Sequence, residues 1–386
     1  MDYIHRELAS TISEAAQYFP VICVTGPRQS GKTTLIRHIF SNYVRFSLED
    51  WDVRSLAQND PIGFLSQTTQ GMVIDEVQQV PELLSYIQGI VDEHPERRFI
   101  LSGSSNFLLL HKVSQSLAGR VGIFELLPMS YHETKEQQST KSLDQLLYEG
   151  LYPAVCAGKN IPKYLYPSYV KTYIEKDVRE LLNVRDSNQF HTFLRLCAGR
   201  IGSIFNASEL ASEVGIAVNT VNAWLSILEA SYIVFRLQAW SENTRKRLIK
   251  SPKLYFCDTG LACYLLGIES PEQLSRDKMR GHLFENLIVT EALKYRYNQG
   301  KDNNLYFYRD SNQQEIDLVI RHADALCGIE IKSSSTYNSE FENTLKKMST
   351  MVASPIQTRA IVYTGDLENR TGEIKLLNFK KLSEIL

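Results

Sequence analysis

The chain has 386 residues, of which 43% are hydrophobic and 22% are charged, and its formal net charge at pH 7 is −2. This length suffices for two or three domains, and the hydrophobic content allows each to bury a core, which excludes a largely disordered protein. The near-neutral charge argues against a protein that coats nucleic acid, although it is compatible with a local basic surface.

The cysteines and the N-terminus bear on the compartment. The six cysteines show no CxxC pair and no spacing that pairs them with histidine, so we interpret them as reduced core thiols. The N-terminal segment MDYIHRELAS lacks the apolar run of a secretion signal, and no stretch of 18 apolar residues predicts a transmembrane helix. We therefore expect a soluble, cytoplasmic protein that does not associate with membranes.

The first part of the chain alternates short apolar strands with amphipathic segments. A helix is expected to begin near Lys32, and strands are predicted at residues 21–25, 43–48, 72–74, 98–101 and 121–126. Strands that alternate with helices form βαβ units around a buried parallel sheet. We predict an α/β multi-domain protein whose residues 1–140 form a domain with a parallel sheet. The segment GPRQSGKT at residues 26–33, between the first strand and the first helix, is typical of a P-loop NTPase domain.

The middle of the chain has helical periodicity. The predicted elements are helices at residues 163–184, 190–198, 208–214 and 218–230 and a β-rich stretch at 232–240. Ser208 is the expected N-cap of the third helix, and Gly215 marks the turn that follows it. A short helix, a glycine turn, a second helix and then strands is the element order of a winged helix-turn-helix. We predict a helical and winged-helix domain over residues 141–250.

After Pro252 the pattern becomes mixed. A helix is predicted at residues 281–295, followed by strands at 305–309, 316–320, 327–331 and 359–363. This order predicts an α+β domain over residues 251–386.

The segment GPRQSGKT at residues 26–33 fits the pattern G-x-x-x-x-G-K-[ST]. Its two glycines allow a tight turn in which backbone N–H groups converge on phosphate oxygens, and the helix that follows directs its positive end at the same anion. The lysine is expected to reach the β- and γ-phosphates, and the threonine hydroxyl to bind Mg²⁺. The predicted ATP contacts are Gly26, Pro27, Arg28, Gln29, Ser30, Gly31, Lys32, Thr33 and Thr34.

A second strand ends in two carboxylates, in the sequence MVIDE at residues 72–76. Asp75 at the strand tip suits contact with the nucleotide-bound Mg²⁺, and Glu76 suits the general base that polarises the attacking water. An isolated DE pair commonly means only that a strand ends in surface acids. Its occurrence downstream of the glycine-rich loop favours the catalytic interpretation.

Several segments resemble the AAA+-type ATPases of the AAA_14/DUF4143 group. They are the DE strand, FILSGSSN at residues 99–106, LAGR at 117–120, YIEKDVR at 173–179 and PKLYFCDTG at 252–260, so the resemblance covers most of the chain. It implies that Ser104, or else Ser105 or Asn106, senses the γ-phosphate at the tip of the fourth strand. It also implies that Arg120 is an arginine finger, acting within the chain or from a neighbouring subunit of a homo-oligomer, with Arg179 as a secondary candidate.

The predicted second helix of the winged helix-turn-helix carries no arginine or lysine among its outward residues Asn219, Thr220, Asn222 and Ser226. Neutralisation of DNA phosphates by lysine and arginine supplies most of the affinity of DNA-binding proteins. The absence of both residue types therefore argues against sequence-specific recognition of DNA by this helix. The run RKRLIK at residues 245–250 and Lys253 are basic and suit contact with a DNA backbone, whereas the alternative is a solvated loop.

The C-terminal region holds a set of charged residues with the spacing of a metal site. Glu285 lies in the predicted helix, Asp317 begins a strand, and Glu330 and Lys332 share one face of the next strand. Carboxylates arranged in this way bind Mg²⁺ or Mn²⁺, and a lysine can activate the water that attacks a phosphate. The set resembles the core of PD-(D/E)xK nucleases, which implies a restriction-endonuclease-like fold with Glu285, Asp317 and Glu330 as metal ligands and Lys332 as a catalytic residue. It departs from that pattern because no proline precedes Asp317.

Two functions remain open. The first is an ATP-driven enzyme that acts on DNA through its winged-helix and nuclease-like regions. The second is a nucleotide-dependent switch whose C-terminal domains bind a protein partner without nuclease activity. A small-molecule kinase would share the glycine-rich loop, but it would not explain the DE strand or the two downstream domains.

Overall fold

The computed structural model describes residues 3–104, 113, 116–174, 187–241 and 251–386. The chain divides into two compact units. The first comprises Met1–Met129 with Ala230–Tyr232 and Tyr297–Lys301, and the second comprises Ser130–Glu229, Ile233–Arg296 and Asp302–Leu386. Ser105, Asn106, Arg179 and the basic run at 245–250 lie outside the described residues.

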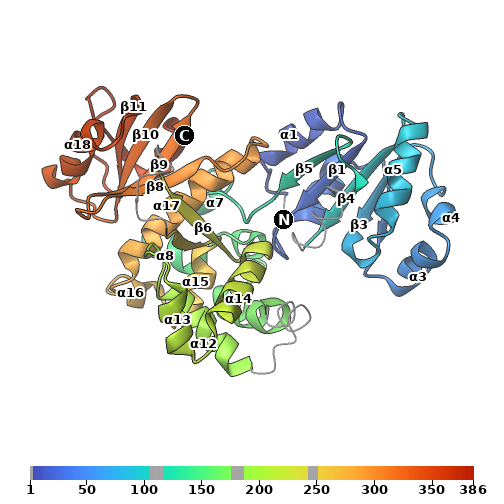
Figure 1. Ribbon diagram of the computed structural model, residues 1–386, viewed down its shortest axis with the longest axis horizontal. Helices are drawn as coiled ribbons and strands as arrows, with labels where there is room; N and C mark the ends of the chain where they lie inside the picture. Colours follow the sequence, from blue (N-terminus) through green and yellow to red (C-terminus); the bar gives the residue numbers. More distant parts are fainter. Residues whose placement is uncertain (1–2, 105–112, 114–115, 175–186, 242–250) are drawn as a thin grey trace. The chain divides into compact units, whose positions relative to one another are not determined.

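The first unit is built on a five-stranded sheet whose neighbouring strands are all parallel (Figure 1). The strands lie in the order β2-β3-β4-β1-β5, so β4 separates β1 from β3. Their bounds are β1 (Val21–Thr25), β2 (Val44–Ser47), β3 (Gly71–Asp75), β4 (Arg98–Gly103) and β5 (Val121–Glu125). The prediction of a parallel α/β sheet is therefore confirmed. Because the strands run the same way, the segments that follow β1, β3 and β4 meet at one edge.

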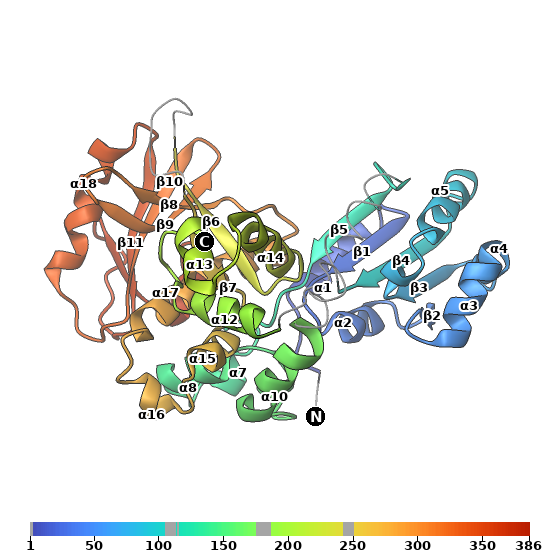
Figure 2. The same ribbon diagram turned by 60° about the horizontal axis from the view of Figure 1, so that its bottom comes forward.

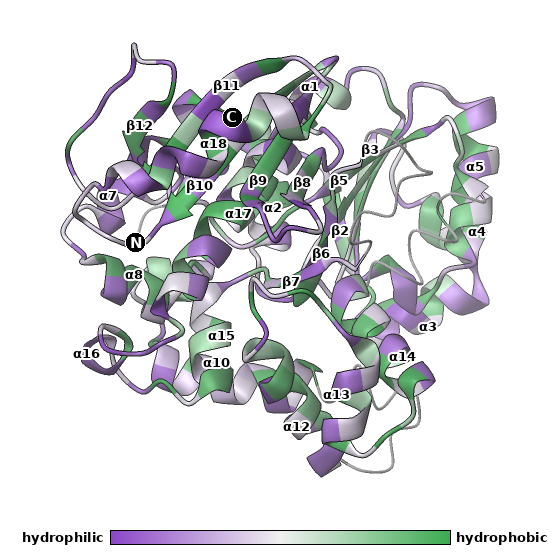
Figure 3. Ribbon diagram, turned by 60° about the vertical axis from the view of Figure 1, so that its left-hand side comes forward, coloured by the Kyte–Doolittle hydropathy of each residue, from purple (hydrophilic) through white to green (hydrophobic). Residues whose placement is uncertain are grey.

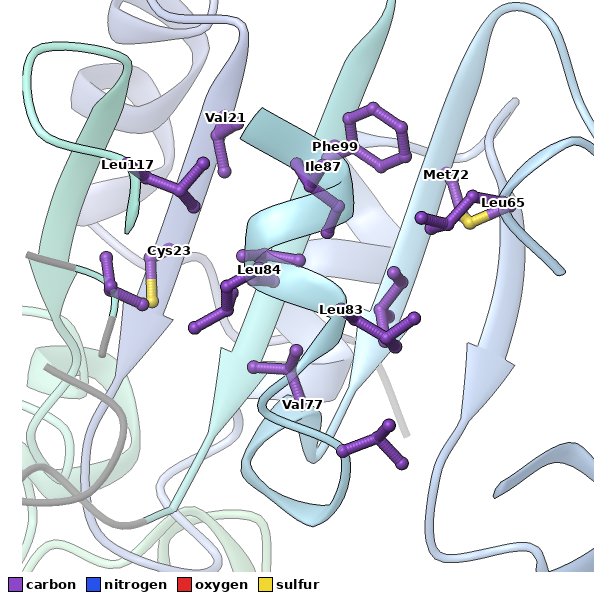
Figure 4. Packing of buried hydrophobic residues seen from close by; sticks show 14 of the residues in the cluster. Val21, Cys23, Leu65, Met72, Val77, Leu83, Leu84, Ile87, Phe99 and Leu117 are labelled. Atoms are coloured by element: carbon purple, nitrogen blue, oxygen red, sulfur yellow. The ribbon is translucent and has the colours of Figure 1, made fainter. Parts of the chain in front are cut away.

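Helices cover both faces of this sheet. Their bounds are α1 (Leu8–Ala15), α2 (Lys32–Ile39), α3 (Trp51–Asn59), α4 (Pro61–Leu65) and α5 (Leu83–Glu93). Alternate residues of β1 face opposite ways: Ile22 and Val24 pack in a cluster with α1 and α2, whereas Val21 and Cys23 pack in a cluster with α5 (Figure 4). A strand that is buried on both faces reads as a continuous apolar run, as β1 does.

The second unit contains a mixed seven-stranded sheet in the order β12-β11-β10-β9-β8-β6-β7. The strands are β6 (Val234–Ala239), β7 (Lys253–Phe256), β8 (Leu305–Arg309), β9 (Glu315–His322), β10 (Ala325–Lys332), β11 (Ile356–Tyr363) and β12 (Lys375–Asn378). The central parts of β9 and β10 are buried and are coloured as hydrophobic in Figure 3. Helix α18 (Asn343–Met351) packs Leu345 and Met348 on one face of this sheet.

The other helices of the second unit follow the predicted order. They are α7 (Lys135–Gln138), α8 (Leu143–Glu149), α9 (Pro153–Cys156), α10 (Pro162–Tyr169), α12 (Ser187–Ala198), α13 (Ala207–Val214), α14 (Val218–Ala230), α15 (Thr259–Leu266), α16 (Pro271–Leu274) and α17 (Arg280–Asn298). Among the helices that the model describes, none combines the length and the apolar composition needed to cross a membrane.

The segment predicted as a winged helix-turn-helix has the expected order of elements, with α13, a left-handed turn at Gly215, α14 and then the antiparallel pair β6 and β7. Figure 2 shows α12, α13 and α14 grouped beside β6 and β7. However, β6 also pairs in parallel with β8, so this hairpin continues the C-terminal sheet. The boundary expected between residues 250 and 251 therefore falls between two hydrogen-bonded strands of one sheet.

One local prediction was wrong. The N-cap of α13 is Asn206, whose side chain accepts hydrogen bonds from the N–H groups of Ser208 and Glu209, so Ser208 is already inside the helix. The helix predicted at residues 163–184 is present as α10, which contains Pro167, and continues over Val170–Ile174 as a π-helix, whereas residues 175–184 lie outside the described part of the chain. A proline inside a helix removes an N–H donor and disturbs the regular ladder.

The buried carboxylate of Asp258 explains the motif CDTG. It caps α15 by accepting from Leu261 N at 3.0 Å, and it also accepts from Leu151 N at 2.7 Å and from the hydroxyl of Tyr166 at 2.8 Å. A Cβ atom at Gly260 would lie 2.2 Å from the same hydroxyl, so no larger residue fits there. The motif therefore has a structural role in joining α8, α10 and α15.

We expect Asp258→Ala to destabilise the second unit by about 3 kcal/mol or more, because three buried donors lose their acceptor. Ser270→Ala, which removes the cap of α16, is the matched control and should cost about 1 kcal/mol. Thermal and denaturant unfolding of the full chain would measure both. Equal destabilisation by the two variants would contradict this account of the motif.

Candidate nucleotide site and C-terminal carboxylate cluster

The glycine-rich loop follows β1 and leads into α2, as its sequence predicts. Gly31 caps α2 with φ at 95°, and Gly26 has φ at 147°, a left-handed region that disfavours side chains. A Cβ atom at Gly26 would lie 2.2 Å from the carbonyl oxygen of Leu126. Both glycines are therefore required for the path of the loop around a ligand.

Lys32 is only 5% exposed, and its ammonium group folds back on the loop. Its Nζ donates to the carbonyl oxygens of Gly26 at 2.9 Å and Pro27 at 2.8 Å. Burial lowers the pKa of Lys32 to about 8, although the nearby carboxylates of Glu76 and Asp75 act in the opposite direction. These carbonyl contacts can be exchanged for phosphate oxygens, which would satisfy the ammonium better.

Thr33 and Asp75 are brought together from α2 and β3. The Thr33 hydroxyl donates to Asp75 Oδ2 at 2.8 Å, and Ser102 at the end of β4 donates to Asp75 Oδ1. A hydroxyl and a carboxylate side by side form the oxygen donor set that Mg²⁺ prefers, so these residues fit the ion. Ser102 was not among the predicted site residues, although it lies only two residues before Ser104.

Glu76 lies beside this pair in a left-handed conformation, with φ at 55°. Its Oε2 accepts hydrogen bonds from Ser104 Oγ at 3.2 Å and from Gln78 Nε2. Burial raises the pKa of Glu76, and the charge of Lys32 and the bond from Gln78 oppose that rise. A strained, non-glycine residue at this position is typical of functional sites. The sequence analysis did not identify Gln78.

The rest of the loop is held from the N-terminal segment. Arg6 is buried and donates to the carbonyl oxygens of Ser30 and Leu127, both at 2.8 Å. Gln29 has φ at 62°, and Thr34 is exposed on the first turn of α2. Arg6 was also missed, because its contacts lie 24 and 121 residues away along the chain.

Arg120 lies at the other edge of the sheet from the loop of the same chain. It directly precedes β5, and its carbonyl oxygen accepts from Val21 N at the start of β1, whereas the loop follows the end of β1. A five-residue strand is roughly 16 Å long. Its guanidinium pairs with Asp92 through contacts of 2.5 and 2.8 Å. This position contradicts a role within the same chain, and a role across subunits stays a prediction.

In the second unit, β9 and β10 form the predicted antiparallel hairpin. Lys332 Nζ lies 2.7 Å from Glu330 Oε2 and 3.5 Å from Asp317 Oδ2, so the structure brings these three residues together. Asp317 Oδ2 also accepts from Ile331 N at 2.8 Å. The pKa of Glu330 is raised to about 8 by burial and by the charge of Asp317, and Lys332 opposes that rise.

Glu285 is occupied by partners that the sequence analysis did not foresee. Its Oε1 accepts from Lys253 Nζ at 3.0 Å and from the Tyr255 hydroxyl at 2.6 Å, both on β7. Lys253 is 2% exposed and also pairs with Glu315 at 2.5 Å, so the expectation that it contacts a DNA backbone was wrong. Burial raises the pKa of Glu285 to about 7, and Lys253 opposes that rise. Lys253 thus neutralises the helix carboxylate.

Within the described part of the chain, no three His, Cys, Asp or Glu side chains gather closely enough to hold a metal ion. At the C-terminal cluster, Asp317 and Glu330 are in addition occupied by the ammonium group of Lys332. Metal binding by Glu285, Asp317 and Glu330 and catalysis by Lys332 stay predictions.

Three family models match successive parts of the chain. They are an AAA domain at residues 18–135, a domain of unknown function, DUF8612, at 140–272, and another, DUF4143, at 280–382. Uncharacterized proteins of Mycobacterium tuberculosis and Mycobacterium bovis are each 30% identical over 365 residues, which is 94% of this chain and 80% of theirs. The chain belongs to the family of these proteins.

More distant similarities cover a smaller part of the chain. An uncharacterized protein of Methanocaldococcus jannaschii is 23% identical over 330 residues, which is 77% of this chain and 71% of that protein. Among solved structures, a Walker-type ATPase of Pyrococcus abyssi aligns with a TM-score of 0.46 and 15% identity, covering 67% of this chain and 94% of that chain. The matched AAA domain contains the glycine-rich loop and the DE strand, so this is an ATP-binding, AAA-type P-loop protein.

We expect nucleotide binding to this AAA-type protein to take up protons between pH 8 and 9. The pKa of Lys32 is about 8 without nucleotide, and bound phosphates raise it, so a Lys32 that is partly neutral becomes fully protonated. Calorimetry with MgADP in two buffers of different ionisation enthalpy would measure this uptake. At pH 6.5 Lys32 is protonated in both states, which provides the control. Identical binding enthalpies in the two buffers at pH 8.5 would disprove the linkage.

Proposed function

We propose that this protein hydrolyses ATP and acts as a nucleotide-dependent switch whose C-terminal region binds a macromolecular partner without cutting it. The observation that carries the ATPase proposal is the convergence of Lys32, the Thr33–Asp75 pair and Glu76 at one edge of the parallel sheet. Nucleotide binding alone requires the loop and the lysine. A buried carboxylate next to them can act as the general base for hydrolysis.

The proposed reaction follows from these positions. Lys32 exchanges its bonds to Gly26 and Pro27 for oxygens of the β- and γ-phosphates. Glu76 accepts a proton from a water, whose oxygen bonds to the γ-phosphorus while the bond to the bridging oxygen of ADP breaks. The products are ADP and inorganic phosphate. Mg²⁺, held by Thr33 and Asp75, supplies positive charge to the phosphate oxygens when it is bound.

Ser104 and Gln78 have a positioning role in this proposal. Both donate to Glu76 Oε2, and they also lie within 3.5 Å of each other, so they fix the direction of the carboxylate. Ser104 also follows β4, the position that the family resemblance assigns to the γ-phosphate sensor. Contact of the Ser104 hydroxyl with ATP would weaken its bond to Glu76, which couples nucleotide sensing to the base.

Arg120 enters the proposal only through a second copy of the chain. In its own subunit it is paired with Asp92 at the edge away from the loop. We propose that it serves a neighbouring subunit in a homo-oligomer, where it would exchange Asp92 for the transferring phosphoryl group.

We expect Glu76→Gln to bind MgATP with nearly unchanged affinity and to lose hydrolysis by about a hundredfold or more, because the amide cannot accept the proton. Glu82→Gln, an exposed glutamate six residues further along, is the matched control and should keep the wild-type rate. Calorimetry and a steady-state phosphate assay separate the two effects. Normal turnover by Glu76→Gln would show that another group is the base.

Two further proposals concern the fold and the activity of the C-terminal region. Its sheet, hairpin and the α13–α14 pair are consistent with the proposed winged-helix and restriction-endonuclease-like folds. Neutralisation of Glu285 by Lys253 favours binding without cleavage. The proximity of Asp317, Glu330 and Lys332 favours the second candidate, a metal-dependent nuclease that acts on DNA.

A plasmid-nicking assay with Mn²⁺ and ATP discriminates between these candidates. Under our proposal the wild type and Asp317→Ala give the same background level of nicking, because the cluster is neutralised by its lysines. Asp324→Ala, in the exposed turn between β9 and β10, is the control. Manganese-dependent nicking that Asp317→Ala abolishes and Asp324→Ala retains would establish the nuclease instead.

A further inference from the structure

A cavity of about 150 Å³ lies between α2 and strands β2 and β3. On α2, β2 and β3, most of the lining residues follow the spacing of one face of the helix or strand. Thr33, Ile36 and Arg37 follow one face of α2 at helical spacing, whereas Arg45 and Ser47 are two apart on β2, and Val73 and Asp75 are two apart on β3. Ser102 and Phe46 complete the wall. Residues of four elements, α2, β2, β3 and β4, therefore line one cavity.

One end of this cavity is positively charged. The Arg37 side chain is exposed and has no hydrogen bond or ion pair to another residue in the described ranges. Arg45 is anchored through Nη2 to the carbonyl oxygens of Phe40 at 2.9 Å and Arg37 at 3.3 Å, which leaves its other nitrogens available. A guanidinium group is suited to bidentate contact with phosphate oxygens.

The other end of the cavity is the nucleotide site itself. Thr33, Asp75 and Ser102, which line the wall, are also the hydrogen-bonded group that fits Mg²⁺ beside the γ-phosphate. Asp75 is the single carboxylate of the lining, and it is occupied by Thr33 and Ser102. The cavity thus begins where the cleaved phosphate would form and ends at two arginines on the surface.

We propose that this cavity binds inorganic phosphate after ATP hydrolysis, with Arg37 and Arg45 as its ligands. The inference rests on the proposed ATPase function and adds a product site to it. A cavity of about 150 Å³ is large enough for a molecule the size of benzene, so a tetrahedral phosphate ion fits. The apolar side chains of Ile36, Phe46 and Val73 restrict water around the ion, which strengthens its attraction to the guanidinium groups.

The site separates phosphate from nucleotide. The loop backbone at residues 26–31 and Lys32, which are expected to hold ADP, do not line this cavity, and of the predicted ATP contacts only Thr33 does. Loss of the two arginines should therefore weaken phosphate binding and leave nucleotide binding unchanged.

The test compares product inhibition in the full-length wild type, Arg37→Gln/Arg45→Gln and the control Arg98→Gln. Arg98 lies at the start of β4, at the sheet edge away from the cavity, so it controls for loss of a charge from the same unit. We expect the inhibition constant of inorganic phosphate to rise about tenfold in the double variant, and the KM for ATP and the inhibition constant of ADP to change less than twofold. The control should match the wild type.

Two results would overturn the proposal. One is unchanged phosphate inhibition in the double variant. The other is a parallel rise in the KM for ATP, which would place the arginines on the nucleotide. If thermal unfolding shows that the double variant is unstable, the single variants Arg37→Gln and Arg45→Gln serve instead, and their inhibition constants for phosphate are compared with the wild type.

A second measurement separates this proposal from the ATPase proposal. Calorimetric titration of inorganic phosphate into the MgADP-loaded protein requires no turnover. Binding in the wild type and its loss in the double variant would support the site even if the wild type did not hydrolyse ATP. No phosphate binding to the MgADP-loaded wild type would disprove it.

Discussion

The burial of the Lys32 ammonium is the constraint on which the nucleotide site depends. A charge that is removed from water must find fixed partners, and here they are two loop carbonyls and the nearby charges of Asp75 and Glu76. The loop can offer those carbonyls only because Gly26 adopts a conformation that a side chain would prevent. The carboxylates arrive because β3 runs parallel to β1, with β4 between them. The order of the strands therefore determines which side chains meet at the nucleotide site.

Paired burial of charge also organises the second unit. Lys253 is almost inaccessible to solvent and links Glu285 on α17 with Glu315 on β9, so one ammonium connects β7, the helix and the sheet. Removing either partner from such a pair leaves an uncompensated charge, which costs far more than the pair itself contributes. This ion-pair network connects elements that all follow residue 250, whereas the pairing of β6 with β7 and β8 joins the region before residue 250 to the same sheet. Any metal bound by Glu285 would have to compete with Lys253 for the carboxylate.

Local spacing predicted the parts of the structure that local geometry determines. The loop at residues 26–33, the DE strand and the strand at 305–309 are each fixed by short-range patterns of glycine, charge and alternation. The site residues that were not predicted depend on contacts between parts of the chain that are distant in sequence. Arg6, Gln78, Ser102 and Lys253 are ordinary polar residues in the sequence, and only folding brings them to the site. Asn206, and not Ser208, is the N-cap of α13. Both residue types suit an N-cap, and a sequence pattern locates a helix end only to within one or two residues.

The position of Arg120 constrains any assembly that uses it. Each first unit presents the loop at the carboxyl edge of its sheet and Arg120 at the amino edge. A twofold contact that buries the amino edges would bring Arg120 to Arg120, and one that buries the loops would exclude it. A heterologous contact, in which the amino edge of one copy faces the loop of the next, delivers the arginine to a phosphate, and such contacts close into a ring or extend into a filament. A twofold contact does so only where the two sheets lie side by side and antiparallel, so that each Arg120 reaches the loop of the other copy. The pairing of Arg120 with Asp92 would then mark the unassembled state, because the same guanidinium cannot hold both partners.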